Sequence, residues 1–246
     1  HLINGETLQE VSPRLGVSYR PLSGTIVHAA AGRGFRAPTI AERFVHFEFG
    51  FRVIANPNLK AEQSFSYDFG VRQQFGDRAH AEITAFSTSY HELIDPTPDA
   101  TFTVQFLNFP RARIRGIETA GAISMLGDHV RLEATATWMD PRDLVFDTLL
   151  QYRPRFIAFV APSLSWKAFT LEADYRFASR LTAEQVQVYP NDQRVPQKQL
   201  DARLLYRRDG LTAQLAVRNV LNYNYTQIER NMNEVRSFSA GVQVEY

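Results

Sequence analysis

The 246-residue sequence contains no cysteine, which excludes a disulfide framework, a thiolate metal site and a cysteine nucleophile. Long apolar runs are also missing. The longest lies around Phe156 to Ala161, far below the roughly 20 residues that a membrane-spanning helix requires. Any crossing of a membrane would therefore have to be made by β-strands. The chain begins at His1 without an initiator methionine or a leader-like segment, so we expect a processed piece or a fragment of a longer protein.

An excess of one charge is absent too, because 27 basic residues face 26 acidic ones. Without a basic footprint, no nucleic-acid partner is expected. The six histidines show no metal-ligand spacing, and no G-x-S-x-G elbow is present, so we expect neither an enzyme nor a bound metal or cofactor. Residues 32–37 fit the G-x-G-x-x-A nucleotide pattern, but Pro38 follows and no βαβ unit surrounds them.

What the sequence does have is alternation of apolar and polar residues. Between Phe169 and Phe177 every odd position is apolar and every even position is polar or charged. Successive side chains of a strand point to opposite faces, so such a strand has one oily face and one charged face. The same pattern recurs along the chain and predicts an all-β protein. Eleven strands are expected, near Ser12–Arg20, Thr25–Arg33, Gln63–Phe75, Arg78–Tyr90, Phe102–Leu126 (interrupted near Pro110), His129–Asp140, Tyr152–Trp166, Phe169–Phe177, Lys198–Arg207, Leu211–Asn219 and Arg236–Tyr246.

The connections alternate between tight turns, rich in Gly and Asp, and long polar loops. Hairpins of a transmembrane β-barrel leave its two rims in this way, with short turns on the periplasmic side. Trp and Tyr favour the boundary of hydrocarbon and water, and Trp166 and Trp138 lie at opposite strand ends. The pattern favours an antiparallel transmembrane meander over the alternative, a soluble β-sandwich, which has no reason to sort its turns by length.

An odd number of strands has a geometric consequence. The first and eleventh strands of a meander run in the same direction, so they cannot close a barrel by antiparallel pairing. An open edge in hydrocarbon would leave several backbone groups without partners, each costing several kcal/mol. We therefore expect further strands before Ser12 in the intact protein.

Several local motifs resemble the TonB-dependent outer-membrane receptors, which import siderophores, cobalamin and some sugars. The first is SPRLGVSYRP followed by AAAGRGFRAPTIAE, within Ser12–Glu42, which resembles a strand pair leading to an FRAP-like loop motif. The second is NPNLKAEQSFSYDFGVRQQ at Asn56–Gln74, similar to the family's NPxLKPE motif except for Ala61. The segment ARIRGIE at Ala112–Glu118 and the ending VRNVLNYNY to RSFSAGVQVEY complete the resemblance.

This resemblance implies an outer-membrane barrel of about 22 strands, of which residues 1–246 would form the C-terminal half. The family's plug domain and TonB-contact segment are not found in these residues. The resemblance further implies that the intact protein is an energised importer. It would take up a scarce solute such as a ferric siderophore and would contact TonB through its plug region. A passive porin-like channel is the main alternative, and a soluble sandwich is a lesser one.

Candidate ligand-contacting and lumen-lining residues are few. The arginines of the loop base and of the ARIRGIE segment suggest an anionic ligand. Arg36 has a second interpretation, favoured here, in which it pairs with a carboxylate of the wall. Crowded aromatics in the following loop suggest packing against another loop or, less strongly, a hydrophobic ligand. The candidates are Arg33, Arg36, Phe47, Phe49, Arg113, Arg115 and Glu118.

The end of the chain resembles the signal that the barrel-assembly machinery reads on a final strand, although a plain lipid-facing edge strand has the same pattern. Outer-membrane lipid and that machinery are accordingly expected partners. The residues concerned are Phe238, Val242, Val244 and Tyr246.

Overall fold

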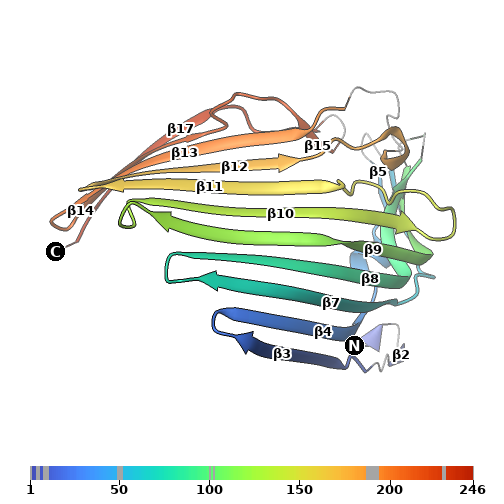
Figure 1. Ribbon diagram of the computed structural model, residues 1–246. Coiled ribbons are helices and arrows are strands. Elements are labelled where there is room, and N and C mark those ends of the chain that lie inside the picture. Colours follow the sequence, from blue (N-terminus) through green and yellow to red (C-terminus); the bar gives the residue numbers. More distant parts are fainter. Residues whose placement is uncertain are drawn as a thin grey trace.

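The computed structural model describes residues 2–3, 6–7, 11–48, 52–99, 101, 103–186, 194–228 and 231–245. In this part the chain forms one large curved sheet, whose eleven main strands are antiparallel and follow each other along the chain, and two small two-stranded sheets (Figure 1). All eleven predicted strands are present, and the predicted all-β meander is confirmed. They are β3 (Arg14–Leu22), β4 (Thr25–Arg36), β7 (Glu62–Phe75), β8 (Ala79–Pro98), β9 (Thr103–Met125), β10 (Val130–Asp143), β11 (Phe156–Trp166), β12 (Phe169–Ala178), β13 (Gln197–Arg208), β14 (Leu211–Arg218) and β17 (Ser237–Val244).

Alternation along the strands gives the sheet an apolar face and a polar face. Cross-strand partners keep the faces in register, so Phe69 pairs with Ala85, which pairs with Ile117, which pairs with Trp138. The apolar face is largely uncovered within the described chain. Large side chains on it are about half exposed or more: Leu15, Val17, Phe65, Tyr67, Phe69, Leu215, Phe238 and Val242.

The short turns have the backbone that their residues predict. Gly24, Gly76, Gly127 and Gly210 all have positive φ, between 59° and 81°. Glycine adopts this region without the steric penalty that a Cβ brings. These hairpins lie at one end of the sheet, and the long connections lie at the other (Figure 1).

The interruption expected near Pro110 is wrong, since β9 runs unbroken through it. The pairs on either side, His91 with Arg111 and Leu93 with Phe109, keep the same register with β8. Opposite the proline, Glu92 takes a positive φ of 56°. Proline lacks the N–H needed for a ladder bond, and the local distortion of β8 accommodates that loss. As a result most of residues 91–101, expected as a loop, extend β8 instead.

The long connection between β4 and β7 has its own structure, which the sequence did not predict. It contains helix α1 (Ile40–Phe44) and strands β5 (Phe47–Glu48) and β6 (Arg52–Ile54). Strand β6 pairs with β5 and also lies parallel to the start of β9. The remaining small elements are β1 (Leu2–Ile3), β2 (Glu6–Thr7), a 3₁₀ turn η1 (Ala183–Gln185), β15 (Thr226–Ile228) and β16 (Asn231–Met232).

Buried apolar contacts are concentrated at the long-loop end. Leu93, Ala112 and Leu150 form a small cluster there, with Tyr90 and Phe109 packed against it. A soluble sandwich would instead bury one face of each sheet against the other. The single sheet with its exposed apolar face contradicts the sandwich alternative. Among the described residues, no helix has the length and apolar character needed to cross a membrane.

Candidate ligand-contacting surfaces

The polar face of β12 to β14 is a wall of paired charges. Arg203 donates to Glu172 at 2.5 Å and 2.8 Å, and Arg176 donates to Asp201 at 2.9 Å. These residues line a recess of about 310 Å³ together with Asp174, Arg218 and the amide of Gln214. Three acids and three arginines balance one another around it. The recess can therefore form hydrogen bonds with a polar solute without selecting strongly for the sign of its charge.

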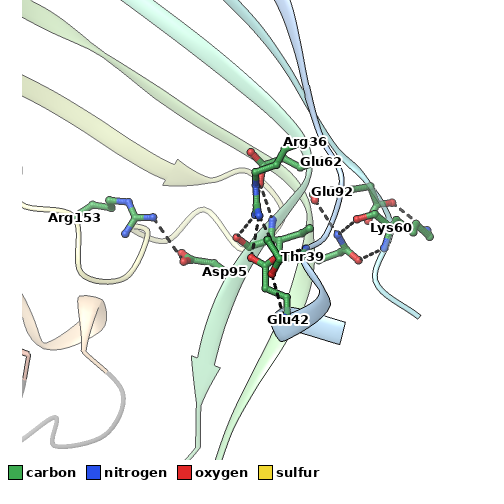
Figure 2. Close-up of polar contacts among 10 residues, drawn as sticks. Arg36, Thr39, Glu42, Lys60, Glu62, Glu92, Asp95 and Arg153 are labelled. Carbon is green, nitrogen blue, oxygen red and sulfur yellow. Dashed lines mark hydrogen bonds and ion pairs between the residues drawn. The ribbon is translucent and has the colours of Figure 1, made fainter. Parts of the chain in front are cut away.

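At the end of β4, Arg36 is held by two carboxylates from different segments. Its guanidinium donates to Glu42 of α1 at 2.9 Å and to Glu62 at the start of β7 at 3.1 Å (Figure 2). The carbonyl of Ile94 accepts a further bond at 3.5 Å, and the Ile94 N–H donates to Glu62 at 3.1 Å. The wall-pairing interpretation of Arg36 therefore agrees with the structure. This network fastens the β4–β7 connection to the wall.

The local sequence positions Glu42 for its contact with Arg36. Thr39 caps α1, and the Glu42 side chain accepts from the Thr39 backbone N–H at 2.7 Å, which forms a capping box. Partial burial opposes ionisation of Glu42, but the bonds from Thr39 and Arg36 outweigh it and hold its pKa below the ordinary value. Burial likewise opposes the charge of Arg36, but Glu42 and Glu62 outweigh that effect and raise its pKa.

A second charged pair lies beside the anchor. Asp95 faces Arg153, whose guanidinium approaches it to 3.6 Å (Figure 2). Burial raises the pKa of Asp95, Arg153 partly offsets this effect, and the nearby Glu62 carboxylate adds to it. The pair joins the β10–β11 connection to the extension of β8, so a loop and a strand end that are distant in sequence meet at this end of the wall.

The predicted candidates fall on both faces of the sheet. Arg36 and Glu118 lie on the polar face, because Arg36 pairs with Glu62 and Glu118 pairs with Thr137. Arg33 pairs with Phe65 and shares the apolar face, so its interpretation as a lumen residue needs correction.

The same correction applies to the arginines of the ARIRGIE segment. Arg113 and Arg115 occupy alternate positions with Ile117, which is opposite Trp138. Both therefore lie on the apolar face, two and four residues beyond the Ile117–Trp138 pair toward the long-loop end. The physical reason is parity: charge alone suggested the lumen, whereas residues an even number of positions from Ile117 must share its face.

The aromatic candidates of the loop are only partly described. Phe47 pairs with Val53 in the β5–β6 hairpin, and its side chain is 46% exposed. Phe49 lies outside the described residues. Whether either contacts a ligand remains a prediction.

In the final strand, Phe238, Val242 and Val244 all lie on the apolar face and are more than half exposed. Tyr246 lies outside the described residues. Within the residues that the structure describes, no group of three His, Asp or Glu side chains converges in a way that could hold a metal ion.

Sequence reasoning missed Glu42, Glu62, Asp95 and Arg153, which build the rim contacts. They come from four segments that only the fold brings together. One local signal was available, namely the spacing of Thr39 and Glu42, which is that of a capping box.

Comparison with known proteins identifies the family. Residues 4–220 match the model of the TonB-dependent receptor-like β-barrel. The chain therefore belongs to the family of TonB-dependent receptor-like β-barrels, which lie in the bacterial outer membrane. In such a barrel the apolar face meets lipid and the polar face lines the lumen.

The names of individual relatives and similar structures specify different solutes. The chain is 31% identical over 144 residues to the vitamin B12 transporter BtuB of Vibrio vulnificus, an alignment that covers 57% of this chain and 22% of that protein. Among solved structures it resembles the copper transporter OprC, with a TM-score of 0.76 and 16% identity. It also resembles the ferric enterobactin receptor PfeA of Pseudomonas aeruginosa, with a TM-score of 0.73 and 15% identity.

Both structural matches cover 96% of this chain, but only 39% of OprC and 40% of PfeA. The chain thus spans about two fifths of the length of these structures. At such low identity the structural likeness establishes the fold alone.

Proposed function

We propose that residues 1–246 form the C-terminal part of the barrel of an energised importer, which takes up a scarce solute such as a ferric siderophore. In this proposal the intact receptor adds the first strands, a plug inside the lumen and a segment that contacts TonB. The observation that carries it is a wall with a lipid-type face and a charge-balanced polar face, in a chain of the TonB-dependent receptor family.

Support for the siderophore comes from the relatives and not from the arginines. Arg33, Arg113 and Arg115 lie on the apolar face, and Arg36 is neutralised by two carboxylates. The argument for an anionic solute from these four residues is therefore withdrawn. The paired charges of the polar face suit a polar solute that is held by many weak hydrogen bonds.

Uptake by cells tests the proposal. The intact receptor, expressed in a strain that lacks its other iron receptors, should import iron-55 bound to a siderophore only when TonB is present. A panel of catecholate, hydroxamate and citrate chelates, with labelled cobalamin as a further arm, would identify the solute class. Uptake of a solute that persists without TonB would instead establish a passive channel.

The last strand supports a separate proposal, that its apolar residues together with Tyr246 form the assembly signal. Deleting Tyr246 from the intact receptor should lower the amount of heat-modifiable, folded barrel in outer membranes. A matched control is Gln243→Ala, which changes the polar face of the same strand. Equal folded amounts for the deletion and the parent would contradict the signal.

A further inference from the structure

We propose that Gln185 is a positioning residue for the mouth of the barrel, the end of the wall where the long connections lie. Its side chain fixes residues 150–153 of the β10–β11 connection, and two of these residues, Leu150 and Arg153, hold the extension of β8. The β12–β13 connection, in which Gln185 lies, is thereby coupled to the β8 extension and through it to α1. Only the effect on a solute rests on the proposed function, because the contacts that make the coupling need no solute.

Gln185 is fully buried although it belongs to the short turn η1 of a long connection. Its side-chain NH₂ group donates to the carbonyl of Leu150 at 3.3 Å and to the carbonyl of Arg153 at 2.6 Å. Its side-chain oxygen accepts from the Thr182 backbone N–H at 3.1 Å, and its backbone carbonyl accepts from the Tyr152 N–H at 3.1 Å. The side chain therefore binds its own turn through its acceptor and the β10–β11 connection through its donors.

This arrangement requires an amide. The NH₂ group of glutamine offers two N–H donors on one atom, whereas an ionised carboxylate has only acceptors. Gln185→Glu would keep the size of the side chain but would place a buried negative charge against two carbonyl oxygens. The chemistry of Gln185, and not only its volume, therefore holds residues 150–153.

The first contact that these residues make with the wall is apolar. Leu150 is 3% exposed and forms the buried cluster with Leu93 of the β8 extension and Ala112 of β9. Ala112 lies an odd number of positions from Ile117, so it lies on the polar face. The β10–β11 connection therefore covers the polar face of the wall at this end.

The second contact is the pair of Arg153 and Asp95, whose closest atoms are 3.6 Å apart (Figure 2). The residue before Asp95 belongs to the Arg36 network. The N–H of Ile94 donates to Glu62 at 3.1 Å, and its carbonyl accepts from Arg36 at 3.5 Å. Adjacent residues of β8 therefore contact the β10–β11 connection and the network that fastens α1.

These contacts form an unbroken series from η1 to α1. Gln185 fixes the backbone at both Leu150 and Arg153, so a shift of η1 displaces both contacts with the β8 extension together. Coupling of this kind is reciprocal, because each end changes the equilibrium of the other by the same factor. A solute that touches either connection would therefore act on both, and the mouth would close over it as one body.

Hydrogen exchange of the intact receptor in mild detergent, followed by mass spectrometry, tests the coupling without any solute. Gln185→Glu should speed exchange about tenfold in residues 150–155 and also in residues 92–98 and 37–48, because two buried hydrogen bonds are lost. Gln185→Met removes the donors without adding a charge and should act in the same way. The matched control is Glu184→Gln, an exposed position of the same turn, which should exchange like the parent.

A second variant tests the route. Leu150→Ala/Arg153→Ala leaves both backbone carbonyls in place for Gln185 but removes the two contacts with the β8 extension. Adding Gln185→Glu to it should cause no further increase of exchange in residues 92–98, because the route is already interrupted. Heat-modifiable mobility on gels checks that each variant is folded. Parent-like exchange of residues 92–98 in both Gln185 variants, or an equal further increase in the triple variant, would overturn the proposal.

Uptake measures the effect on capture, with iron-55 carried by enterobactin as the probe. Gln185→Glu should raise the half-saturating concentration and leave the maximal rate near that of the parent, because the energised step needs TonB and not the mouth. An unchanged half-saturating concentration would overturn the role of Gln185 in capture. No uptake by the parent would contradict the proposed function alone, and the exchange measurements would still decide the coupling.

Discussion

The two faces of this sheet are made by the same strands, but charged side chains occupy different positions on them. On the polar face of β12 and β13, arginines and acids lie in mid-strand and pair across strands while one third to one half exposed, as Arg203 and Glu172 do. On the apolar face of β9 and β10, arginine is found only beyond the Ile117–Trp138 pair. Charge is therefore tolerated along the whole height of one face and only at the margin of the other.

The difference follows from the solvent that each face meets. An ion in a water-filled lumen keeps much of its hydration, and an exposed pair there contributes about 0–1 kcal/mol. On the lipid side, arginine at mid-height costs about 2–4 kcal/mol, and this cost falls toward the interface. Arg113 and Arg115 lie beyond the Ile117–Trp138 pair toward the long-loop end, where this cost is smaller.

The largest effect is expected when arginine is placed on the apolar face of β14, and the same substitution at the neighbouring position on the polar face serves for comparison. Leu215→Arg should destabilise the folded barrel by about 2–4 kcal/mol, because Leu215 is 59% exposed on the apolar face. Gln214→Arg places the same side chain on the polar face and should change stability by less than about 0.5 kcal/mol. Urea unfolding of the intact receptor in lipid vesicles measures both, and equal losses would contradict the assignment of the faces.

The next largest effect is expected at the rim anchor, the network in which Arg36 binds Glu42 and Glu62. Arg36→Ala leaves Glu42 and Glu62 without their shared partner, although both side chains are only 13–14% exposed. We expect a loss of about 1–2 kcal/mol, confined to the β4–β7 connection. Limited proteolysis of whole cells should cut residues 37–61 faster while the barrel stays folded. Arg33→Ala, three positions earlier on the other face, is the control and should leave the cutting rate unchanged.

The anchor should also depend on pH, with a sign set by Glu42. The pKa of this carboxyl is lowered from 4.5 in the folded state, so its stabilisation is complete above about pH 4.5 and is lost as the pH falls through the lowered value. Asp95, whose pKa is raised, acts in the opposite direction. Proteolysis of residues 37–61 by an acid protease should accelerate below pH 4.5 in the parent. In the Glu42→Gln variant these residues should be cut at a high rate that is nearly independent of pH. A pH profile of cutting like that of the parent would contradict the mechanism.

The smallest effect belongs to the lumen pairs. Arg203→Ala removes the partner of Glu172, but both groups are at least one third exposed, so the loss of unfolding free energy should stay below about 1 kcal/mol. The same urea unfolding measures it. A loss as large as that of Leu215→Arg would show that the polar face is not in contact with water.

Much of the fold could be predicted because period-two alternation and turn residues are local signals. They placed all eleven strands, and the motifs from FRAP to the final VQVEY indicated the family. The errors lie where the outcome depends on a neighbour. Pro110 looked like a break, but the register of β8 with β9 persists on both sides of it.

The site was predicted less well for a related reason. Arg36 was recognised as a candidate, but its partners Glu42 and Glu62 come from a helix and a strand that the chain folds back to reach. Arg113 and Arg115 were also recognised as ligand-contacting or lumen-lining candidates, but the register of the sheet places them on the apolar face. Residue type indicated that these positions matter, whereas the face depended on counting from Ile117 in the paired sheet.

By itself, the sequence determined that this chain forms strands with one oily and one charged side, because each side chain's direction in a strand follows from its position in the chain. Only the tertiary structure decided which charges meet. The contacts among β4, α1, β7, β8 and the β10–β11 connection join residues up to 58 positions apart, since Arg36 reaches the carbonyl of Ile94. Such contacts depend on how the whole sheet curves and pairs, and no local pattern contains that information.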